Sequence, residues 1–377
     1  MIDEAHFSHG LAGDQLEPDW PALTAEETAK VIARVPSLGE LRSVDWHSPR
    51  PLSAAALVTT TAGSVFIKRH HRSVRDETSL AEEHRFATFL REAGIPVPRI
   101  LRDADGMTAF GSRDWIYELH EPARGVDIYR DAFSWSPMGA QGHAIAAGSM
   151  LARMHVAAEA YDAPQRHTHI LVARSDILAS NDPLATIATQ LLARPALARY
   201  LNDRDWRGEI GDAIAPWHEH AAEALATQSR LWTHGDWHVS NLCWSGPEDG
   251  AVITDVLDFG LSAATFALFD LATTIERNAI AWLEIDRADI ARPDLALAII
   301  AGYRLVRPLD ADALDVLARL LPIVHLDFAL SEVEYFEGIT GRRDHADVAY
   351  HAFLRGHAAW FTGPYGRALL EAIRSAV

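Results

Sequence analysis

The sequence of 377 residues predicts an α+β protein with two unequal lobes, a small antiparallel sheet with one helix and then a larger, mainly helical lobe. Short β-patterned runs separated by turn signals fill residues 41–119, with one helical stretch among them. After residue 121 the chain is rich in Ala and Leu and helical in pattern, except for a β-like island at residues 231–260. We therefore expect an N-terminal extension with one helix at residues 1–36, a sheet lobe at 37–119 and a helical lobe at 120–377.

The start of the chain leads through one helix into a β-hairpin. Thr24 and Glu27 have the spacing of a capping box, so a helix should begin after Thr24 and stop near Pro36. Turns are expected at residues 48–51, which contain two prolines, and at residues 61–63, which end in glycine. The strands that these turns join are expected at residues 41–46, 55–60 and 64–69.

The rest of the sheet lobe contains one helix and two more strands. Residues 78–93 carry apolar side chains at helical spacing, and Gly94 should end this helix. The chain then runs through a strand at residues 99–101 and a hairpin turn at residues 103–106. A strand at residues 115–119 completes a predicted sheet of five strands.

The composition excludes several classes of protein. A formal charge of -18, from 34 basic and 52 acidic residues, argues against a protein that binds nucleic acid by neutralising phosphates. The single cysteine, Cys243, excludes a disulfide framework and a cysteine-based zinc site. Residues 1–10 lack the pattern of a signal peptide, and no uninterrupted apolar run is long enough to span a membrane. We therefore expect a cytoplasmic protein that binds neither nucleic acid nor membranes.

The β-like island carries the motif on which the functional prediction depends. Residues 234–241 read H-G-D-W-H-V-S-N, and a D-F-G sequence begins at Asp258 after a hairpin-length segment. Phosphoryl transfer needs an aspartate that orients the attacking hydroxyl and accepts its proton, the role predicted for Asp236. Magnesium prefers oxygen ligands, so Asn241 and Asp258 are the predicted metal ligands. Gly260 should let the backbone turn away. The alternative is a β-hairpin whose polar residues only cap turns.

These motifs resemble those of the aminoglycoside phosphotransferase and choline kinase superfamily, the protein-kinase-like small-molecule kinases. The form H-G-D-x-H-x-x-N is more similar to this group than to protein kinases, and most similar to its homoserine-kinase-like and stress-response-kinase-like branch. The resemblance covers roughly residues 40–340. It implies a bilobal protein-kinase-like fold, ATP and Mg²⁺ as cofactors, and transfer of the γ-phosphoryl group to a hydroxyl of a small molecule.

The resemblance also implies a nucleotide site. Lys68, one of only two lysines in the chain, matches the strand lysine that holds the phosphates of ATP. Its partner is expected on the following helix, where the family's spacing favours Glu83 over Glu82. The backbone of Glu118 and His120 is expected to bind the adenine base.

The loop that should cover the phosphates departs from the family pattern. Nucleotide-binding kinases usually have a Gly-rich loop there, but residues 48–54 contain two prolines and no glycine. The donors that remain are backbone N–H groups and the hydroxyls of Ser48 and Ser53. The preference between ATP and GTP is therefore left open.

Other polar residues have two interpretations each. Asp270 resembles the aspartate that tethers the catalytic loop, or it is a helix N-cap. His234 and His238 are expected to brace that loop, whereas His70 and His218 are interpreted as surface groups rather than zinc ligands. Residues on two later helices either line an acceptor pocket suited to an amine-bearing alcohol or form solvated faces. They are Glu276, Arg277, Asn278, Trp282, Asp327, Glu332, Glu334 and Tyr335.

Two other functions stay open beside a small-molecule kinase. One is a Ser/Thr protein kinase of the stress-response type, although the short segment between Gly260 and Asp270 has no A-P-E activation sequence. The other is a non-catalytic nucleotide-binding module, which the glycine-free loop favours and the intact catalytic motif opposes. Homoserine, choline, amino sugars and aminoglycosides all remain possible acceptors of the small-molecule kinase.

Overall fold

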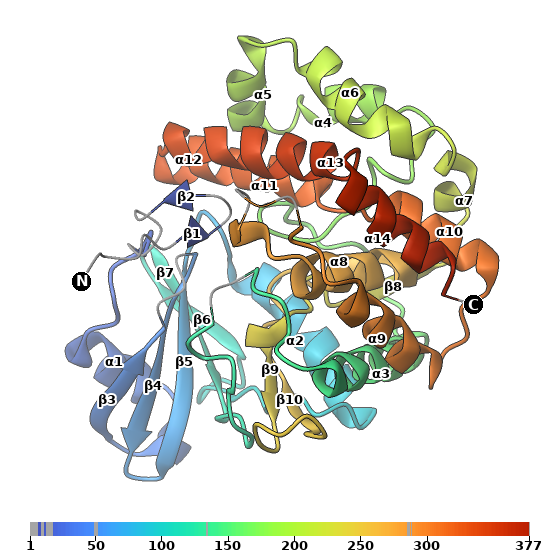
Figure 1. Cartoon of the computed structure of the whole chain (residues 1–377). Coiled ribbons are helices and arrows are strands. Elements are labelled where there is room, and N and C mark those ends of the chain that lie inside the picture. Colours follow the sequence, from blue (N-terminus) through green and yellow to red (C-terminus); the bar gives the residue numbers. More distant parts are fainter. Residues whose placement is uncertain are drawn as a thin grey trace, which may run out of the picture.

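The computed structural model describes residues 7–8, 11–12, 18–48, 52–132, 135–284, 287 and 289–376. It confirms the predicted α+β fold, because a sheet with its helices forms one lobe and most helices gather in the other (Figure 1). β1 (Phe7–Ser8) and β2 (Leu11–Ala12) pair as a short hairpin ahead of the first lobe. Among the described residues, none of the helices combines the length and the apolar character that crossing a lipid bilayer requires.

Five strands form the sheet of the first lobe in the order β3-β4-β5-β7-β6, and all neighbours are antiparallel. They are β3 (Leu41–His47), β4 (Ala54–Thr60), β5 (Gly63–His71), β6 (Ala109–Ser112) and β7 (Trp115–His120). Val58, Val65 and Ile67 point into a common core, as the period of two in a strand requires. Of the predicted turn at residues 48–51, residues 49–51 lie outside the described part of the chain.

The fourth strand of the sheet in sequence order is β6, and not the segment at residues 99–101 that the sequence predicts. Residues 99–101 pair with the end of β7 through backbone hydrogen bonds, one of them from Leu101 N to Leu119 O at 2.8 Å. The predicted turn at residues 103–106 then ends this pairing, because the carboxylate of Asp103 accepts backbone N–H groups two and four residues later. The chain leaves the sheet there and returns as β6.

Helix starts in the first lobe follow their capping residues. α1 (Ala25–Ile32) begins at the predicted capping box. α2 (Glu77–Glu92) begins one residue earlier than predicted, because the carboxylate of Asp76 accepts the N–H of Ser79. One face of α2 is buried and connects the sheet to the second lobe.

The second lobe is mainly helical, as predicted. Its α-helices are α3 (Gln141–Ala158), α4 (Pro183–Gln190), α5 (Pro195–Asn202), α6 (Trp206–His218), α7 (Ala222–Ala226), α8 (Ala267–Ala279), α9 (Pro293–Arg304), α10 (Ala311–Leu320), α11 (Leu326–Tyr335), α12 (Arg343–Val348), α13 (His357–Trp360) and α14 (Pro364–Arg374). π-Helical segments follow α11 and α12, at Phe336–Thr340 and Ala349–Gly356. Short 3₁₀ helices lie at Val239–Asn241 and Trp282–Glu284 in this lobe, and another at Pro36–Leu38 precedes β3 in the first lobe.

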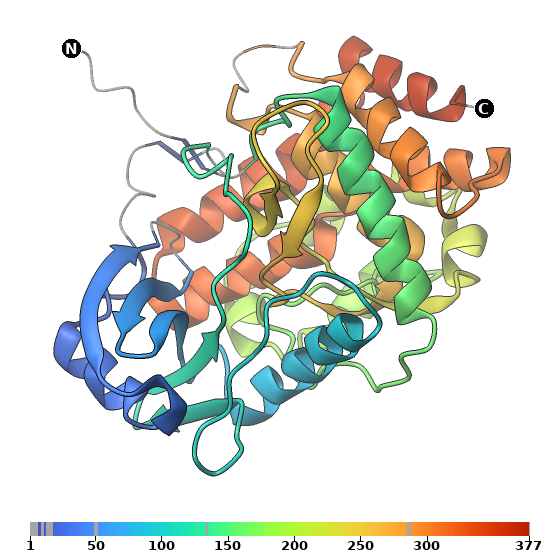
Figure 2. The ribbon, with the colours of Figure 1, turned by 90° about the horizontal axis from the view of Figure 1, so that it is seen from below.

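The predicted β-like island forms two small antiparallel pairs. β8 (Arg230–Thr233) pairs with β11 (Ala263–Phe266), and β9 (Leu242–Trp244) pairs with β10 (Ile253–Val256). Figure 2 shows the hairpin of β9 and β10, in yellow, beside α3, in green. These pairs carry the catalytic motif into the second lobe.

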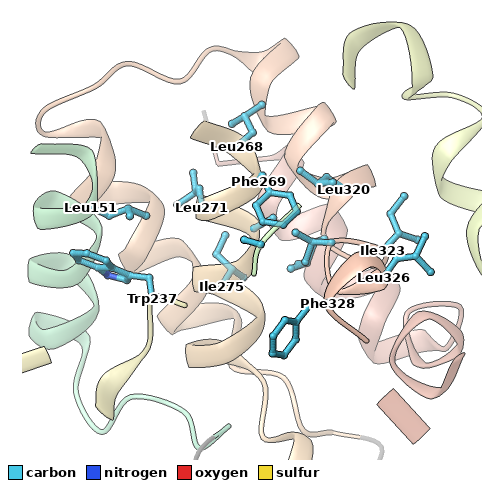
Figure 3. Close-up of a cluster of buried hydrophobic side chains, with 14 of the residues drawn as sticks. Leu151, Trp237, Leu268, Phe269, Leu271, Ile275, Leu320, Ile323, Leu326 and Phe328 are labelled. Atoms are coloured by element: carbon cyan, nitrogen blue, oxygen red, sulfur yellow. The ribbon is translucent and has the colours of Figure 1, made fainter. Parts of the chain in front are cut away.

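The loop after β8 is anchored in the main hydrophobic core. The indole of Trp237, in the middle of this loop, is fully buried next to Leu151 of α3 and near Leu271 of α8 (Figure 3). On the other side of α8, Phe269 faces the side chains of α10 and α11. A large side chain fixed in this way restricts the backbone of the loop that carries it.

Candidate active site

Two strand pairs bring the separate parts of the motif together. The loop of residues 234–241 joins β8 to β9, and Asp258 follows β10, the partner of β9. Leu257 N donates to Asn241 O at 2.8 Å, which links the two segments through their backbones. The ring of His234 adds a second link, with Nε2 lying 2.9 Å from Leu257 O. Asp236, Asn241 and Asp258 therefore lie in one region of the fold.

Asp270 holds the catalytic loop from α8. It accepts the backbone N–H groups of His234 and Gly235, each at 2.9 Å, and His155 Nε2 lies 3.1 Å from its Oδ2. Burial raises the pKa of the Asp270 carboxyl, but the contact with His155 lowers it below its ordinary value overall. The N-cap of α8 is Phe266, so the N-cap interpretation of Asp270 is wrong and its carboxylate tethers the loop.

Asn278 and a loop histidine complete this attachment. Asn278 Oδ1 accepts the N–H of Val239 at 3.0 Å, and its Nδ2 donates to Trp237 O at 2.8 Å. His238 Nδ1 accepts the N–H of Ser240 at 3.3 Å, which is the bracing predicted for this histidine. The loop is thus fixed by side chains along its whole length.

Among the described residues, the carboxylate of Asp236 lies beside the side chains of Asn241, Arg277 and His238. Asn241 Nδ2 donates to Asp236 Oδ2 at 3.0 Å and to its backbone oxygen at 2.8 Å. Arg277 Nη1 of α8 donates to Asp236 Oδ1, and His238 Nε2 lies 3.6 Å from the same oxygen. Burial raises the pKa of Asp236, but the charge of Arg277 lowers it well below its ordinary value overall. The carboxylate is therefore ionised.

An ion pair joins the two lobes at Lys68. Its Nζ on β5 lies 2.7 Å from Asp258 Oδ1, and the Lys68 side chain is 13% exposed whereas that of Asp258 is 39% exposed. Burial lowers the pKa of Lys68, yet the charges of Asp258, Glu118 and Glu83 raise it above its ordinary value overall. The ammonium group therefore stays charged at the interface of the sheet with the catalytic motif.

The glycine after Asp258 has a different role from the predicted one. The left-handed backbone conformation falls on Asp258, with φ 55°, and not on Gly260. A Cβ at Gly260 would lie 3.0 Å from Asp258 Oδ1, which accepts the N–H of Gly260 at 3.2 Å. The position needs glycine for the close approach of this carboxylate rather than for a reversal of the chain.

Glu83 lies near Lys68 but pairs with another residue. Its Oε2 is 3.5 Å from Arg166 Nη2, and among the described residues no hydrogen bond or ion pair joins it to Lys68. Arg166 also donates to the backbone oxygens of Ser79 and Ser262, at 2.9 Å and 3.1 Å. Sequence reasoning missed Arg166, because it stands in an irregular segment without a motif.

The predicted phosphate loop is described only in part. The backbone N–H of Ser48 donates to Ala55 O at 2.8 Å, so this donor is used in the sheet. Ser53 immediately precedes β4. Residues 49–51 of this loop lie outside the described residues.

The oxygen atoms at Asn241 and Asp258 fit a magnesium ion. Asn241 uses its Nδ2 on Asp236, so Oδ1 is the atom with which it would hold a metal. Burial raises the pKa of Asp258, but Lys68 lowers it below its ordinary value overall, so this carboxylate is ionised. An amide oxygen and an ionised carboxylate are hard donors of the kind that Mg²⁺ prefers.

A family model confirms the resemblance found in these motifs. The model described as "Phosphotransferase enzyme family" matches residues 52–311. The chain belongs to the phosphotransferase enzyme family. A curated relative in this comparison, an uncharacterized protein of Synechocystis sp., is 26% identical over 278 residues, which are 70% of this chain. The match spans 65% of that relative, less than two thirds of its length.

Solved structures of small-molecule kinases share the fold of this family member. An amicoumacin kinase in complex with AMP-PNP and Ca²⁺ has a TM-score of 0.56 at 14% identity, over 93% of each chain. A microcompartment-associated aminopropanol kinase has a TM-score of 0.55 at 15% identity, over 94% of this chain and 100% of the other. A spectinomycin phosphotransferase has a TM-score of 0.51 at 11% identity, over 94% and 98%. At these identities the likeness shows the fold.

A buried carboxylate of this phosphotransferase-family protein is surrounded by histidines. Glu118 of β7 lies in register with Lys68 of β5, and its carboxylate is 2.9 Å from His70 Nε2, 2.6 Å from His84 Nε2 and 2.9 Å from His120 Nε2. Burial raises the pKa of Glu118, but the histidines lower it well below its ordinary value overall. His70 is buried, so its interpretation as a surface group is wrong, as it is for buried His218.

This histidine group was not found from the sequence, although two signals pointed to it. His70 lies two residues from Lys68, and His120 two residues from Glu118, so each pair shares one face of its strand. No local pattern links His84 of α2 to them. Glu118 lies in the sheet, where it pairs with residues of β5 and β6. The adenine contacts expected of its backbone and of His120 stay a prediction.

The residues expected to line the acceptor pocket are buried. Their interpretation as solvated helix faces is therefore wrong. Glu276 Oε1 lies 3.2 Å from Nδ1 of His325 and 3.2 Å from Nδ1 of His357. Trp282 stacks on His357 with ring centroids 3.5 Å apart, and Tyr335 donates from its hydroxyl to a carboxylate oxygen of Asp19 at 2.9 Å. Glu276, Trp282 and Tyr335 therefore each have an ion-pair, stacking or hydrogen-bond partner within the fold.

Proposed function

We propose that this protein is an ATP- and magnesium-dependent phosphotransferase that moves the γ-phosphoryl group of ATP to a hydroxyl of a small molecule. The observation that carries the proposal is one site built from both lobes. In this site Lys68 bridges to Asp258 at 2.7 Å, and the loop beside Asp258 holds an ionised Asp236 against Asn241. This is the set of groups that phosphoryl transfer needs.

Each group has a role that follows from its chemistry. Asp236 would orient the acceptor hydroxyl and take its proton, and Asn241 holds that carboxylate through Nδ2. Asn241 Oδ1 and the Asp258 carboxylate would hold Mg²⁺, which when bound neutralises charge on the phosphates. Lys68 would leave Asp258 to hold the phosphates as a compact cation. Glu83 would act on Lys68 through its nearby negative charge, and the backbone at Glu118 and His120 would receive adenine.

A small acceptor fits the chain better than a protein acceptor. Residues 259–266 connect Asp258 to α8 by a turn and β11, so this connection holds no long activation segment. The structural relatives act on small molecules by their names, an amicoumacin, an aminopropanol and a spectinomycin kinase. Both observations support a small-molecule alcohol as acceptor.

The test is ADP release with Mg-ATP across a panel of small alcohols, in the wild type and in Asp236→Asn. We expect Asp236→Asn to lower kcat by about 10²–10⁴-fold, the usual contribution of a general base. Asp212→Asn, an exposed aspartate of α6, is the control and should keep the wild-type rate. Nucleotide binding without turnover on alcohols or proteins would instead indicate a non-catalytic module, and turnover on proteins alone a protein kinase.

A further inference from the structure

Arg277 places a permanent positive charge beside the proposed general base. Its side chain is 9% exposed, and its Nη1 donates to Asp236 Oδ1. The guanidinium lies over the rings of Trp135, at 4.3 Å, and Phe328, at 5.4 Å. Its Nε is buried without a hydrogen-bond partner among the described residues. A planar fork of donors is therefore fixed next to the site of the acceptor hydroxyl.

The carboxylates expected to bind an ammonium group already have cationic or neutral partners. Glu276 lies between His325 and His357, as described above. Glu334 Oε2 is 2.6 Å from Arg194 Nε and also contacts a histidine. Both carboxylates therefore have partners within the fold, and the charge of Glu334 is balanced by Arg194.

Burial raises the pKa of both remaining acidic side chains of this region, and only Glu332 is held largely in its neutral form at pH 7. Burial raises the pKa of Asp327 to about 6, and the N–H of Ile177 donates to it at 3.4 Å. Burial raises the pKa of Glu332 to about 8, in spite of the charge of Arg277. At neutral pH Glu332 is therefore largely protonated, and the group in contact with the Asp236 carboxylate is the cation Arg277, whose charge would repel the ammonium group of an amine-bearing alcohol.

We infer that the acceptor alcohol carries a carboxylate, which Arg277 binds while Asp236 holds the hydroxyl. This inference rests on the proposed function. Arginine presents two parallel N–H groups that match the two oxygens of a carboxylate, and the flanking rings keep water from competing. Without acceptor, Asp236 forms an ion pair with Arg277. When the acceptor binds, its carboxylate replaces Asp236 at Arg277, and Asp236 then accepts a hydrogen bond from the acceptor hydroxyl. The two contacts together require both groups on one small molecule.

Matched acceptors that differ only in their charged group test the inference. The rate of ADP release with Mg-ATP is compared for 3-hydroxypropionate and 3-amino-1-propanol, and for 4-hydroxybutyrate and 4-amino-1-butanol. We expect kcat/KM of the wild type to favour the carboxylate of each pair by at least about 30-fold, as expected for a desolvated charge pair. A preference for the amines, with turnover that depends on Asp236, would overturn the inference and leave the proposed function intact.

Variants at Arg277 separate binding of the substrate from support of the fold. Arg277→Met keeps most of the side-chain volume, and we expect it to raise KM for the carboxylates and to reduce their preference to less than about 3-fold. Arg277→Lys should retain part of the preference, because it keeps the charge without the fork. Arg199→Met removes an exposed arginine of α5 and should retain all of it. Equal losses for both members of each pair would show a structural role and overturn the inference.

A binding measurement decides the case in which neither class is phosphorylated. That outcome would count against the proposed function itself. Thermal stabilisation by 3-hydroxypropionate or 4-hydroxybutyrate is then measured in the presence of ADP and Mg²⁺. Stabilisation of the wild type but not of Arg277→Met supports the arginine as a carboxylate site. The same response in both proteins, or a larger response to the amines, overturns it.

Discussion

Replacing Asp270 by asparagine tests whether α8 positions the catalytic loop. The shape of the side chain is kept, but one carboxylate oxygen becomes an NH₂ group. Asp270 Oδ2 accepts the N–H of His234 and Oδ1 accepts the N–H of Gly235, in a fully buried environment. Asparagine has one side-chain oxygen, so it can accept only one of these two backbone N–H groups. The other N–H group then faces the NH₂ group of the asparagine, which is itself a donor.

The contacts of Asp270 set the size of the expected effect. A hydrogen bond to a charged group contributes about 1.5–3 kcal/mol, and a buried N–H left without a partner costs about 1–3 kcal/mol. The contact with His155 also loses its charged partner. We expect the free energy of unfolding to fall by about 3–5 kcal/mol, as for other broken buried pairs. A loop displaced by about 1 Å should lower kcat by about 100-fold.

Denaturant unfolding followed by tryptophan fluorescence measures the first quantity, and initial rates of ADP release measure the second. Asp312→Asn is the matched control, because Asp312 also lies in the first turn of a helix, α10, but is exposed. It should change stability by no more than about 0.5 kcal/mol. A loss below about 1 kcal/mol in Asp270→Asn, with unchanged kcat, would refute the tether.

Three further changes have expected outcomes. Gly260→Ala should weaken binding of Mg-ATP, measured by calorimetry, because its Cβ would crowd the carboxylate of Asp258; unaltered affinity would contradict the close approach. Glu118→Gln should lower the free energy of unfolding by about 1–3 kcal/mol, measured in denaturant, because it replaces an acceptor of three histidines by a group that also donates. Burial raises the pKa of Glu332 to about 8; the folded state therefore binds the extra proton, and stability falls as pH rises from about 5 to 8, by up to about 1.4 kcal/mol per pH unit. Glu332→Gln should flatten this dependence in melts across that range, and an equal slope in both proteins would count against it.

The parts of the fold that depend on local patterns were predictable. The capping box at Thr24 and the turn that joins β4 to β5 are properties of neighbouring residues, and the structure confirms both. The spacing within residues 234–241 is likewise local, so the loop and its hairpin could be predicted. Asp258 was tied to them because a hairpin of that length returns to its starting point.

The contacts that were missed join residues far apart in the sequence. His84 and Glu118 are 34 positions apart, and Glu276 and His357 are 81 positions apart. The periodicity of a helix or strand gives no information about contacts between residues so far apart in the sequence, because these contacts depend on how the elements pack. For the same reason the sequence leaves the acidic side chains of α8 and α11 open between an amine-binding pocket and solvated helix faces, whereas packing places histidines beside Glu276 and Arg194 beside Glu334.

The most direct test of phosphoryl transfer is to follow the phosphorus of ATP itself. ³¹P NMR is recorded on the wild type and on Asp236→Asn with Mg²⁺, ATP and the acceptor alcohols. We predict that the wild type converts the γ-phosphoryl signal into a phosphate monoester, with one ADP formed for each ester, and that the variant does not within the same time. Release of inorganic phosphate alone, or ester formation at the same rate in the variant, would contradict the proposed site.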